Sequence, residues 1–249
     1  MMGKVALVTG AAAGIGAACA KRLAQDGIAI GVLDLDATRC ADTVRAITAA
    51  GGTAMALGAD VSKKDQLEAA VSKLRSAFGP VTIVVNSAGV TDFCPFEEIT
   101  EERWRRVNEI NVWGTMVCIQ AVLPDMKAAK WGRVVNISSS SAQTGAISMA
   151  TYSSSKGAIV TLTRTLAQEL GPLGITVNNI PPGSVMNTIM SEANKDRFQI
   201  PFDTLIKAIP VRRQGEPEDI AHACAFIVDD AASYFTGQTV GVNGGRVVS

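Results

Sequence analysis

Short runs of consecutive apolar residues alternate with longer amphipathic stretches along the whole chain. The apolar runs are apolar at nearly every position, which is typical of strands buried on both faces of a parallel sheet. They predict strands at 4–9, 28–33, 53–58, 81–86, 132–138, 174–180 and 238–243. The amphipathic stretches predict helices at 15–25, 38–49, 64–78, about 101–127, 152–170 and 217–228.

This order of elements predicts a single α/β domain over residues 1–249. Seven parallel strands joined by helical crossovers form a doubly wound sheet of the Rossmann type, with helices on both faces. No linker, repeat or low-complexity tract divides the chain. Ligands of such sheets bind beyond the carboxyl ends of the strands, so we expect the chemistry in the turns that follow them.

Composition narrows the class of protein. The 23 basic and 23 acidic residues balance, which argues against nucleic acid as the main partner. Five cysteines, an odd number without a CxxC pair, argue against a disulfide framework and against a metal site. The single histidine, His222, lies in a helical pattern and is the only base available for a Ser-His-Asp triad. The first apolar stretch is too short and glycine-rich for a signal peptide or a membrane span, so we expect a cytoplasmic enzyme.

A glycine-rich turn follows the first predicted strand. Residues 9–16 read TGAAAGIG. Glycines let a chain turn sharply and come close to a phosphate, and the helix that begins near Gly14 offers free N–H groups and a positive dipole end. The pattern is not a Walker loop, because no Lys-Ser or Lys-Thr pair follows it. It predicts a phosphate site, with simple strand-to-helix packing as the alternative.

The second predicted strand ends in a carboxylate, Asp34, eighteen residues after Gly16. Such a carboxylate accepts hydrogen bonds from the adenosine ribose of a dinucleotide. It repels a 2′-phosphate by roughly 4 kcal/mol per charge pair at about 4 Å and an effective dielectric near 20. No arginine follows it directly, although Arg39 is near, so NAD is expected rather than NADP. The alternative, a carboxylate that only caps the next helix, suits Asp36 better than Asp34.

Tyr152 and Lys156 stand four residues apart in the run SMATYSSSKG, in a chain with only two tyrosines. Residues i and i+4 of a helix share one face, so the two side chains project together. An ammonium about 5 Å from a phenol contributes roughly 3 kcal/mol at an effective dielectric of 20. That energy lowers the pKa of a tyrosine by about two units from its usual value of about 10. The pair therefore predicts a general acid/base, with an ordinary surface pair as the alternative.

These and several further motifs occur in order along nearly the whole chain. Together they give a sequence that resembles the short-chain dehydrogenase/reductase family. The matching elements are TGAAAGIG at 9–16, Asp60-Val61, NSAG at 86–89, Asn111 in NEINVWG, Ser139 in VVNISS, Tyr152 with Lys156, Pro182-Gly183 and Asn243-Gly244-Gly245.

The resemblance implies a role for each matching catalytic position. Tyr152 is expected to be the general acid/base on the alcohol or carbonyl oxygen, and Lys156 to assist it and to hydrogen-bond the nicotinamide ribose. Ser139 is expected to orient and polarise the substrate oxygen. Asn111 is expected to hold a water that links Lys156 to solvent.

The resemblance also implies a cofactor-binding set. The residues expected at the pyrophosphate are Gly10, Ala13, Gly14, Ile15 and Gly16, and those expected at the adenosine are Asp34, Leu35, Asp60 and Val61. Those expected along the wall of the fourth strand are Asn86, Ala88 and Gly89. Those expected at the nicotinamide carboxamide are Pro182, Gly183 and Val185.

Three positions depart from the family pattern. Ser87 stands where the family often has asparagine, and Pro181 where it often has alanine. The position of a usual threonine, five residues after Pro182, holds Asn187, and Thr188 follows it. A contact to the carboxamide or phosphate of the cofactor is therefore open to either residue.

The segment at about 186–210 predicts a substrate lid, because long irregular segments near a site often close over it. Its apolar residues indicate either a hydrophobic substrate or packing of the lid itself. The expected substrate contacts are Ser139, Tyr152, Phe93, Met149 and Met190.

The leading hypothesis is an NAD-dependent enzyme that interconverts a secondary alcohol and a ketone by hydride transfer. The expected substrate is an apolar small molecule: a hydroxyacyl thioester, or a steroid-like, cyclic or aromatic alcohol. The alternative is a catalytically silent family member that binds nucleotide and acts by association. The resemblance implies a homotetramer, and Trp104 and Trp113 in the long fourth helix belong either to the core or to a subunit contact.

Overall fold

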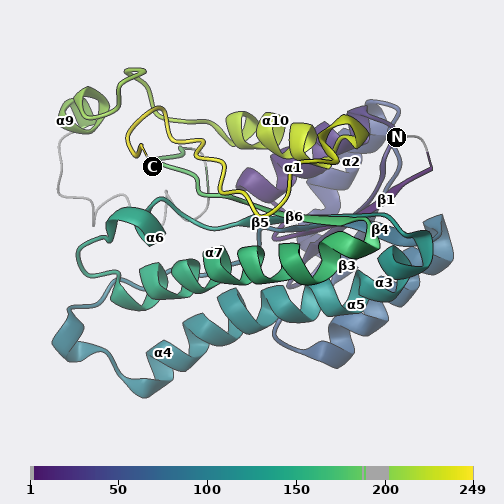
Figure 1. Cartoon of the computed structure of the whole chain (residues 1–249), viewed down its shortest axis with the longest axis horizontal. Coiled ribbons are helices and arrows are strands. Elements are labelled where there is room, and N and C mark those ends of the chain that lie inside the picture. The colour runs from purple at the N-terminus through teal and green to yellow at the C-terminus, as the bar shows by residue number, and fades with distance from the viewer. Residues whose placement is uncertain (1–2, 187, 189–201, 249) are drawn as a thin grey trace.

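Six parallel strands form one sheet in the order β3-β2-β1-β4-β5-β6 (Figure 1). The computed structural model describes residues 3–186, 188 and 202–248. The reversal of strand order between β1 and β4 is that of a doubly wound Rossmann sheet, which confirms the predicted fold class. The strands are β1 Val5–Thr9, β2 Ala29–Asp34, β3 Ala54–Gly58, β4 Val81–Asn86, β5 Gly132–Ile137 and β6 Ile175–Ile180.

The predicted seventh strand at 238–243 is not a full strand. The segment runs beside β6 through isolated bridges, Asn179 to Thr239 and Pro182 to Val242. The N–H of Val240 donates to the carbonyl of Asn179 at 2.8 Å. A continuous ladder does not form, because β6 ends at Ile180 and two prolines without N–H groups follow it.

Helices cover both faces of the sheet (Figure 1). None of the helices in the described part of the chain has the length and apolar character that a membrane crossing requires. One face carries α1 Gly14–Gln25, α2 Ala41–Ala49 and α10 Pro217–Val228. The other carries α3 Lys64–Phe78, α5 Gly114–Ala129 and α7 Ala150–Leu170, with α4 Glu101–Asn108 preceding α5. The shorter helices are η1 Ala37–Cys40, η2 Phe96–Glu98, α6 Ser141–Thr144, η4 Gly171–Leu173, α9 Phe202–Lys207 and η6 Asp230–Ala232.

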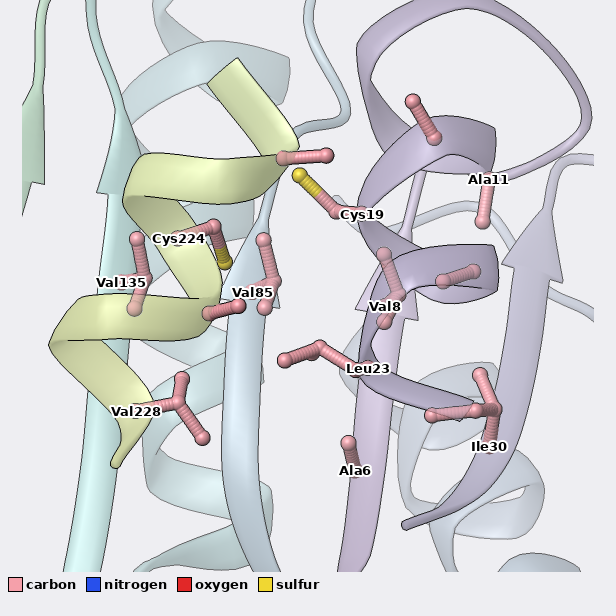
Figure 2. Close-up of a cluster of buried hydrophobic side chains, with 14 of the residues drawn as sticks. Ala6, Val8, Ala11, Cys19, Leu23, Ile30, Val85, Val135, Cys224 and Val228 are labelled. Atoms are coloured by element: carbon pink, nitrogen blue, oxygen red, sulfur yellow. The ribbon is translucent and has the colours of Figure 1, made fainter. Parts of the chain in front are cut away.

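Apolar residues fill successive positions of each strand because both faces are covered. In β1, Ala6 and Val8 point into the cluster under α1 and α10, whereas Val5 and Leu7 point into the cluster under α3, α5 and α7. Figure 2 shows the first cluster, where Leu23 of α1 packs between the strands and α10. Full burial of a side chain such as valine or leucine stabilises the fold by about 1.5–3 kcal/mol.

A π-helical segment, η3 Glu109–Trp113, interrupts the helix that was predicted as continuous from 101 to 127. It lies between α4 and α5 and contains Asn111, which is almost fully buried. Such π-helical insertions often occur at functional sites, because the extra residue re-aims one side chain without ending the helix. The chain is therefore helical across the predicted range of about 101–127, and it departs from regular α-helical geometry at the position where Asn111 enters the interior.

Candidate active site

The glycine turn lies at the carboxyl edge of β1 and is locked to the end of β4. Gly10 has a φ of +63°, and a Cβ atom there would lie 2.9 Å from the Cα of Ala88. A Cβ on Gly16 would lie 2.3 Å from the carbonyl oxygen of Gly10. The hydroxyl oxygen of Thr9 accepts from the N–H groups of Ser87 and Ala88, both at 3.1 Å. Only glycine fits these two positions of the turn.

Helix α1 begins directly above this turn. Its N-cap residue, Ala13, is extended and supplies no side-chain hydrogen bond to the first turn. Ile15 packs on the core beneath α1. The first N–H groups of a helix have no partner within the helix, and here no side chain of the N-cap residue satisfies them. Uncapped N–H groups and the helix dipole suit a phosphate group.

Asp34 lies beside the turn, at the end of β2. Its Oδ2 accepts from the N–H of Ala12 at 3.3 Å, and its Oδ1 accepts from the N–H of Leu35 at 2.9 Å. Asp36, by contrast, caps η1 by accepting from the N–H of Thr38 at 2.9 Å. The alternative role as a helix cap therefore belongs to Asp36, whereas Asp34 faces the glycine turn.

Ser139, Tyr152 and Lys156 come together at the ends of β5 and α7. Tyr152 and Lys156 are 7% and 5% exposed, and the Nζ of Lys156 is 5.8 Å from the centre of the Tyr152 ring. That Nζ donates to the carbonyl of Ile137 at 2.8 Å. Ser139 hydrogen-bonds the phenol of Tyr152, while its Oγ accepts from the N–H of Ser141 at 3.1 Å. The i, i+4 pair is therefore buried rather than on the surface.

Burial shifts the pKa values of this pair toward their neutral forms. Desolvation raises the pKa of the Tyr152 phenol, and the hydrogen bond with Ser139 offsets only part of that rise. Desolvation also lowers the pKa of Lys156 to about 8. The expectation that the Lys156 cation lowers the pKa of Tyr152 by about two units was wrong for this structure, because loss of hydration raises the pKa of the phenol.

Asn111 lies next to Lys156 and is held by several hydrogen bonds. Its Oδ1 accepts from the N–H of Val90 at 2.8 Å, and its Nδ2 donates to the Val90 carbonyl at 2.9 Å and to the Oγ of Ser155 at 3.0 Å. A Cβ on Gly89 would lie 3.1 Å from its Oδ1 and 3.4 Å from the Nζ of Lys156. Asn111 therefore ties the segment after β4 to α7.

Ser155 and Val90 belong to this arrangement but were not predicted from the sequence. Ser155 is fully buried, and its hydroxyl also donates to the Tyr152 carbonyl at 2.7 Å. The signal available in the sequence was its place between Tyr152 and Lys156. Val90 acts through its backbone, which no residue type can indicate.

The two predicted residues after β3 are engaged locally. Asp60 accepts from the N–H and the hydroxyl of Ser62, at 2.9 and 2.8 Å. Val61 is buried against the start of α5, where a Cβ on Gly114 would lie 2.8 Å from its Cγ2. Both residues lie beyond the carboxyl end of β3, on the adenosine side of the expected crevice.

The segment after β6 lies next to Ser139. The carbonyl of Pro182 accepts from the N–H of Ser140 at 2.9 Å, and a Cβ on Gly183 would lie 2.9 Å from the Cβ of Asn243. Val185 forms a bridge with Gly215. The predicted proline-glycine turn therefore lies beside the segment that carries Ser139.

Thr188 lies over the glycine turn. A Cβ on Gly14 would lie 3.4 Å from the Cβ of Thr188. Asn187 lies outside the described residues. Of the two residues left open by the sequence, Thr188 is thus the one whose described position is next to the expected phosphate site.

A loop before α4 and a loop before α7 meet on the substrate side. The N–H of Cys94 donates to the carbonyl of Ser148 at 2.8 Å, and Ser148 has a positive φ of 58°. Phe93 is half-buried and Met149 is buried next to these contacts. Met190 and most of the predicted lid lie outside the described residues. Among the described residues, no cluster of metal-ligating side chains is present.

Comparison with known proteins identifies the family. A family model described as enoyl-(acyl carrier protein) reductase matches residues 10–246. The chain belongs to the short-chain dehydrogenase/reductase family, oxidoreductases that act on alcohol or ketone groups with a nicotinamide cofactor.

Individual relatives cover almost the whole chain. A short-chain reductase protein, NovJ, from Streptomyces niveus is 40% identical over 246 residues, which are 97% of this chain and 93% of NovJ. A 3-oxoacyl-(acyl-carrier-protein) reductase, FabG, from Staphylococcus epidermidis is 37% identical over 245 residues, 98% of this chain and 99% of its own. A hydroxy(phenyl)methylsuccinyl-CoA dehydrogenase subunit, BbsD, from Thauera aromatica is 37% identical over 243 residues, 98% of this chain and 96% of its own.

Proposed function

We propose that this protein is an NAD-dependent oxidoreductase that interconverts an apolar secondary alcohol and the corresponding ketone. The observation that carries the proposal is the buried group of Ser139, Tyr152 and Lys156 at the carboxyl edge of the sheet. It lies on the same edge as a glycine turn that suits a phosphate. A catalytically silent family member would not need to keep these three side chains together.

The residues at this edge fit a dinucleotide. The first turn of α1 has N–H groups without a side-chain cap, and Asp34 has an oxygen facing the turn. The Oδ1 of Asn86 and the Oγ of Ser138, at the ends of β4 and β5, are buried without a hydrogen-bond partner in the described part of the chain. Buried polar atoms require partners, so these positions favour a polar ligand in the crevice.

The cofactor set predicted from the sequence is retained in this proposal. The glycine turn and Thr188 would hold the pyrophosphate, Asp34 and Leu35 the adenosine ribose, and Asp60 and Val61 the adenine. Asn86, Ala88 and Gly89 would line the fourth-strand wall, and Pro182, Gly183 and Val185 would hold the carboxamide. The bound nicotinamide supplies hydride transfer to or from the carbinol carbon.

Tyr152 would carry the proton. In the reductive direction its phenol donates to the carbonyl oxygen of the substrate, and in the oxidative direction its oxygen accepts the alcohol proton. The hydroxyl of Ser139 would hold that same substrate oxygen. Lys156 would assist Tyr152 and bind the nicotinamide ribose. Asn111 would hold the segment after β4 in position next to Lys156. It would also hold the water that links Lys156 to solvent.

Asp34 supports NAD as the cofactor. Its carboxylate is 14% exposed and lies beside the glycine turn. A 2′-phosphate at about 4 Å would be repelled by roughly 4 kcal/mol per charge pair at an effective dielectric near 20. A ribose with free hydroxyls instead gains hydrogen bonds there.

The surroundings of Tyr152 favour an apolar substrate body. Phe93 and Met149 lie on that side, and the exposed side chains of Ile147 and Phe96 were not predicted but belong to the same loops. The names of two relatives refer to thioesters. One is an oxoacyl thioester of acyl-carrier protein, and the other is a coenzyme A thioester whose acyl group bears a phenyl group. Hydroxyacyl thioesters and aromatic or cyclic alcohols are therefore the first substrates to test.

We further propose a homotetramer in the cytoplasm. Trp104 and Trp113, in α4 and η3, are 50% and 43% exposed. Large exposed aromatic side chains on successive helical segments are suited to a helix-to-helix contact between subunits. Light scattering coupled to size exclusion measures the mass. A monomeric parent would contradict this part of the proposal.

The proposed reaction is tested by NADH absorbance with a panel of apolar secondary alcohols and ketones. Tyr152→Phe removes the proton donor and is expected to lower kcat/KM by roughly 100- to 10,000-fold. Tyr234→Phe is the matched control, because Tyr234 is the only other tyrosine and is fully exposed. A Tyr152→Phe variant as fast as the parent would remove the mechanism, and turnover of no substrate by the parent would favour the silent alternative.

A further inference from the structure

The carboxylate of Asp34 has a cationic partner that the cofactor proposal does not use. The NH1 of Arg39 lies 2.9 Å from its Oδ1. That same Oδ1 accepts from the N–H of Leu35, and Oδ2 accepts from the N–H of Ala12. Three donors therefore surround the side chain that is expected to receive a ribose.

These donors leave little room for a ribose diol. A carboxylate has about four lone-pair sites, and three of them are engaged here. A ribose 2′,3′-diol brings two O–H donors. Both hydroxyls can bind only if one present partner leaves, and the two backbone N–H groups are fixed by the turn and the strand.

Arg39 is the partner that can leave. Its side chain is 47% exposed, and exposed ion pairs of this kind are weak. Its backbone, however, is held in place, because the Arg39 N–H donates to the carbonyl of Asp36 and η1 packs on the end of β3. A Cβ on Gly58 would lie 2.8 Å from the nitrogen of Ala37 in that helix. The guanidinium is thus tethered at the ribose end of the crevice while its head can rotate.

We propose that Arg39 is a specificity-determining residue that acts as a movable counterion. With NAD it leaves Asp34 to the ribose hydroxyls. With NADP it pairs with the 2′-phosphate, for which a planar guanidinium fork is well suited. The site therefore prefers NAD but retains measurable NADP binding through Arg39. This inference rests on the proposed cofactor crevice.

Calorimetric titration of NAD and NADP into the parent and Arg39→Ala tests the inference without any need for turnover. In Arg39→Ala the Kd for NADP is expected to rise about tenfold or more, the usual loss when a charge-assisted hydrogen bond is removed. The Kd for NAD is expected to stay within about threefold, because the exposed ion pair that it displaces is weak.

Arg45→Ala is the matched control. Arg45 lies on α2, is exposed and pairs with Asp42, so its removal changes the net charge equally without touching Asp34. Both cofactors are expected to bind this variant within about twofold of the parent, since exposed charges at this range are screened. A loss of NADP affinity equal to that in Arg39→Ala would mean that net charge alone acts, which would overturn the proposal.

Asp34→Asn separates this inference from the choice of NAD. It removes the carboxylate charge and releases Arg39, so NADP is expected to bind more tightly and NAD more weakly. The gain for NADP is expected to vanish in Asp34→Asn with Arg39→Ala. If the parent binds NADP more tightly than NAD, the NAD proposal fails, yet selective loss of NADP in Arg39→Ala still supports the role of Arg39. Equal weakening of both cofactors, or no change in either, would refute that role.

Discussion

Two buried cations lie at opposite ends of β5 and have different surroundings. Lys156 reaches the carboxyl end, where its Nζ donates to the Ile137 carbonyl. Arg133 lies at the amino end, is 2% exposed, and donates through NH1 to the Gly132 carbonyl at 3.0 Å. Burial lowers the pKa of both side chains. In charge and burial alone, the two residues are alike.

Their neighbours differ in kind. Lys156 is flanked by Tyr152 and Asn111, and Tyr152 in turn contacts Ser139; these are the residues proposed to exchange or position a proton. Arg133 stacks on the ring of Trp131 at 4.4 Å, beside a cavity of about 400 Å³, and no carboxylate among the described residues forms an ion pair with it. The comparison indicates that position, and not burial alone, makes Lys156 a candidate for catalysis, because Lys156 lies beside Tyr152 and the proposed cofactor crevice.

The largest expected difference between the two cations is in activity. Lys156→Met is expected to lower kcat/KM at least roughly 100-fold, because Tyr152 loses its assisting group. Arg133→Met is expected to stay within about threefold of the parent, because nothing near it touches the crevice. Steady-state rates with NAD and a turned-over alcohol give both values. An equal loss in the two variants would show that burial of charge, rather than position, matters.

The second prediction concerns the dependence of stability on pH. Burial lowers the pKa of Lys156 to about 8 in the folded protein, whereas the ordinary value of 10.5 applies in the unfolded chain. Between these values the unfolded chain binds more protons, so stability rises with pH. The free energy of unfolding of the parent should gain roughly 2–3 kcal/mol between about pH 7 and about pH 10 from this group.

Denaturant unfolding at several pH values checks this gain. Lys156→Met is expected to lack it and to be more stable than the parent near pH 7, because a buried charge is replaced by an apolar side chain. Arg133→Met should keep the gain, since arginine does not titrate in this range. Parallel stability profiles for the parent and Lys156→Met would contradict the lowered pKa.

A glycine lies against each cation, and the two should respond differently to alanine. A Cβ on Gly89 would meet Asn111 and Lys156 at 3.1 and 3.4 Å, so Gly89→Ala is expected to lower kcat/KM about tenfold by a small misplacement of Lys156. A Cβ on Gly132 would lie 2.7 Å from the Sδ of Met126, so Gly132→Ala is expected to cost about 1–3 kcal/mol of stability. Steady-state rates and denaturant unfolding of both variants test this difference. A loss of activity in Gly132→Ala without a loss of stability would contradict it.

The smallest effect is expected at Trp131. Its ring lies 3.7 Å from the Nζ of Lys4 and under the guanidinium of Arg133. Trp131→Phe keeps an aromatic face and should cost about 1 kcal/mol or less, with unchanged kcat/KM. Denaturant unfolding of Trp131→Phe and the parent under the same conditions measures this change in stability. A larger loss would mean that the indole N–H, which helps to lower the pKa of Asp230, carries most of the contact.

Local patterns were sufficient to predict most of the architecture. The helices at 64–78 and 217–228 and the strand at 81–86 have the predicted bounds, because each has a clear period and a clear stop signal. The strand at 238–243 was wrong, because its partner strand ends before two prolines. The error arises because Pro181 and Pro182 lie far from 238–243 in the sequence, and the periodicity of one segment carries no information about its partner.

The candidate site shows the same division. The i, i+4 spacing of Tyr152 and Lys156 and the glycines at 10, 14 and 16 place their side chains and backbone locally. The π-helical turn at Asn111 and the contact of Ser155 with it depend on packing between α5, α7 and the segment after β4. The sequence places Arg39 five residues after Asp34, but it does not predict the ion pair between the two side chains.

The sequence by itself determined which residues are the candidates for the chemistry, because the glycine turn, the phenol of Tyr152 and the ammonium of Lys156 are set by residue type. Helical spacing places the last two on one face. The tertiary structure alone decided their state. Only folding removes water from Tyr152 and Lys156, which raises the pKa of the phenol and lowers the pKa of the ammonium and so favours the uncharged form of each. Only folding brings Arg39 to Asp34 and Asn111 to Lys156. Hydration and contact across the sheet depend on where distant segments meet, which no local pattern encodes.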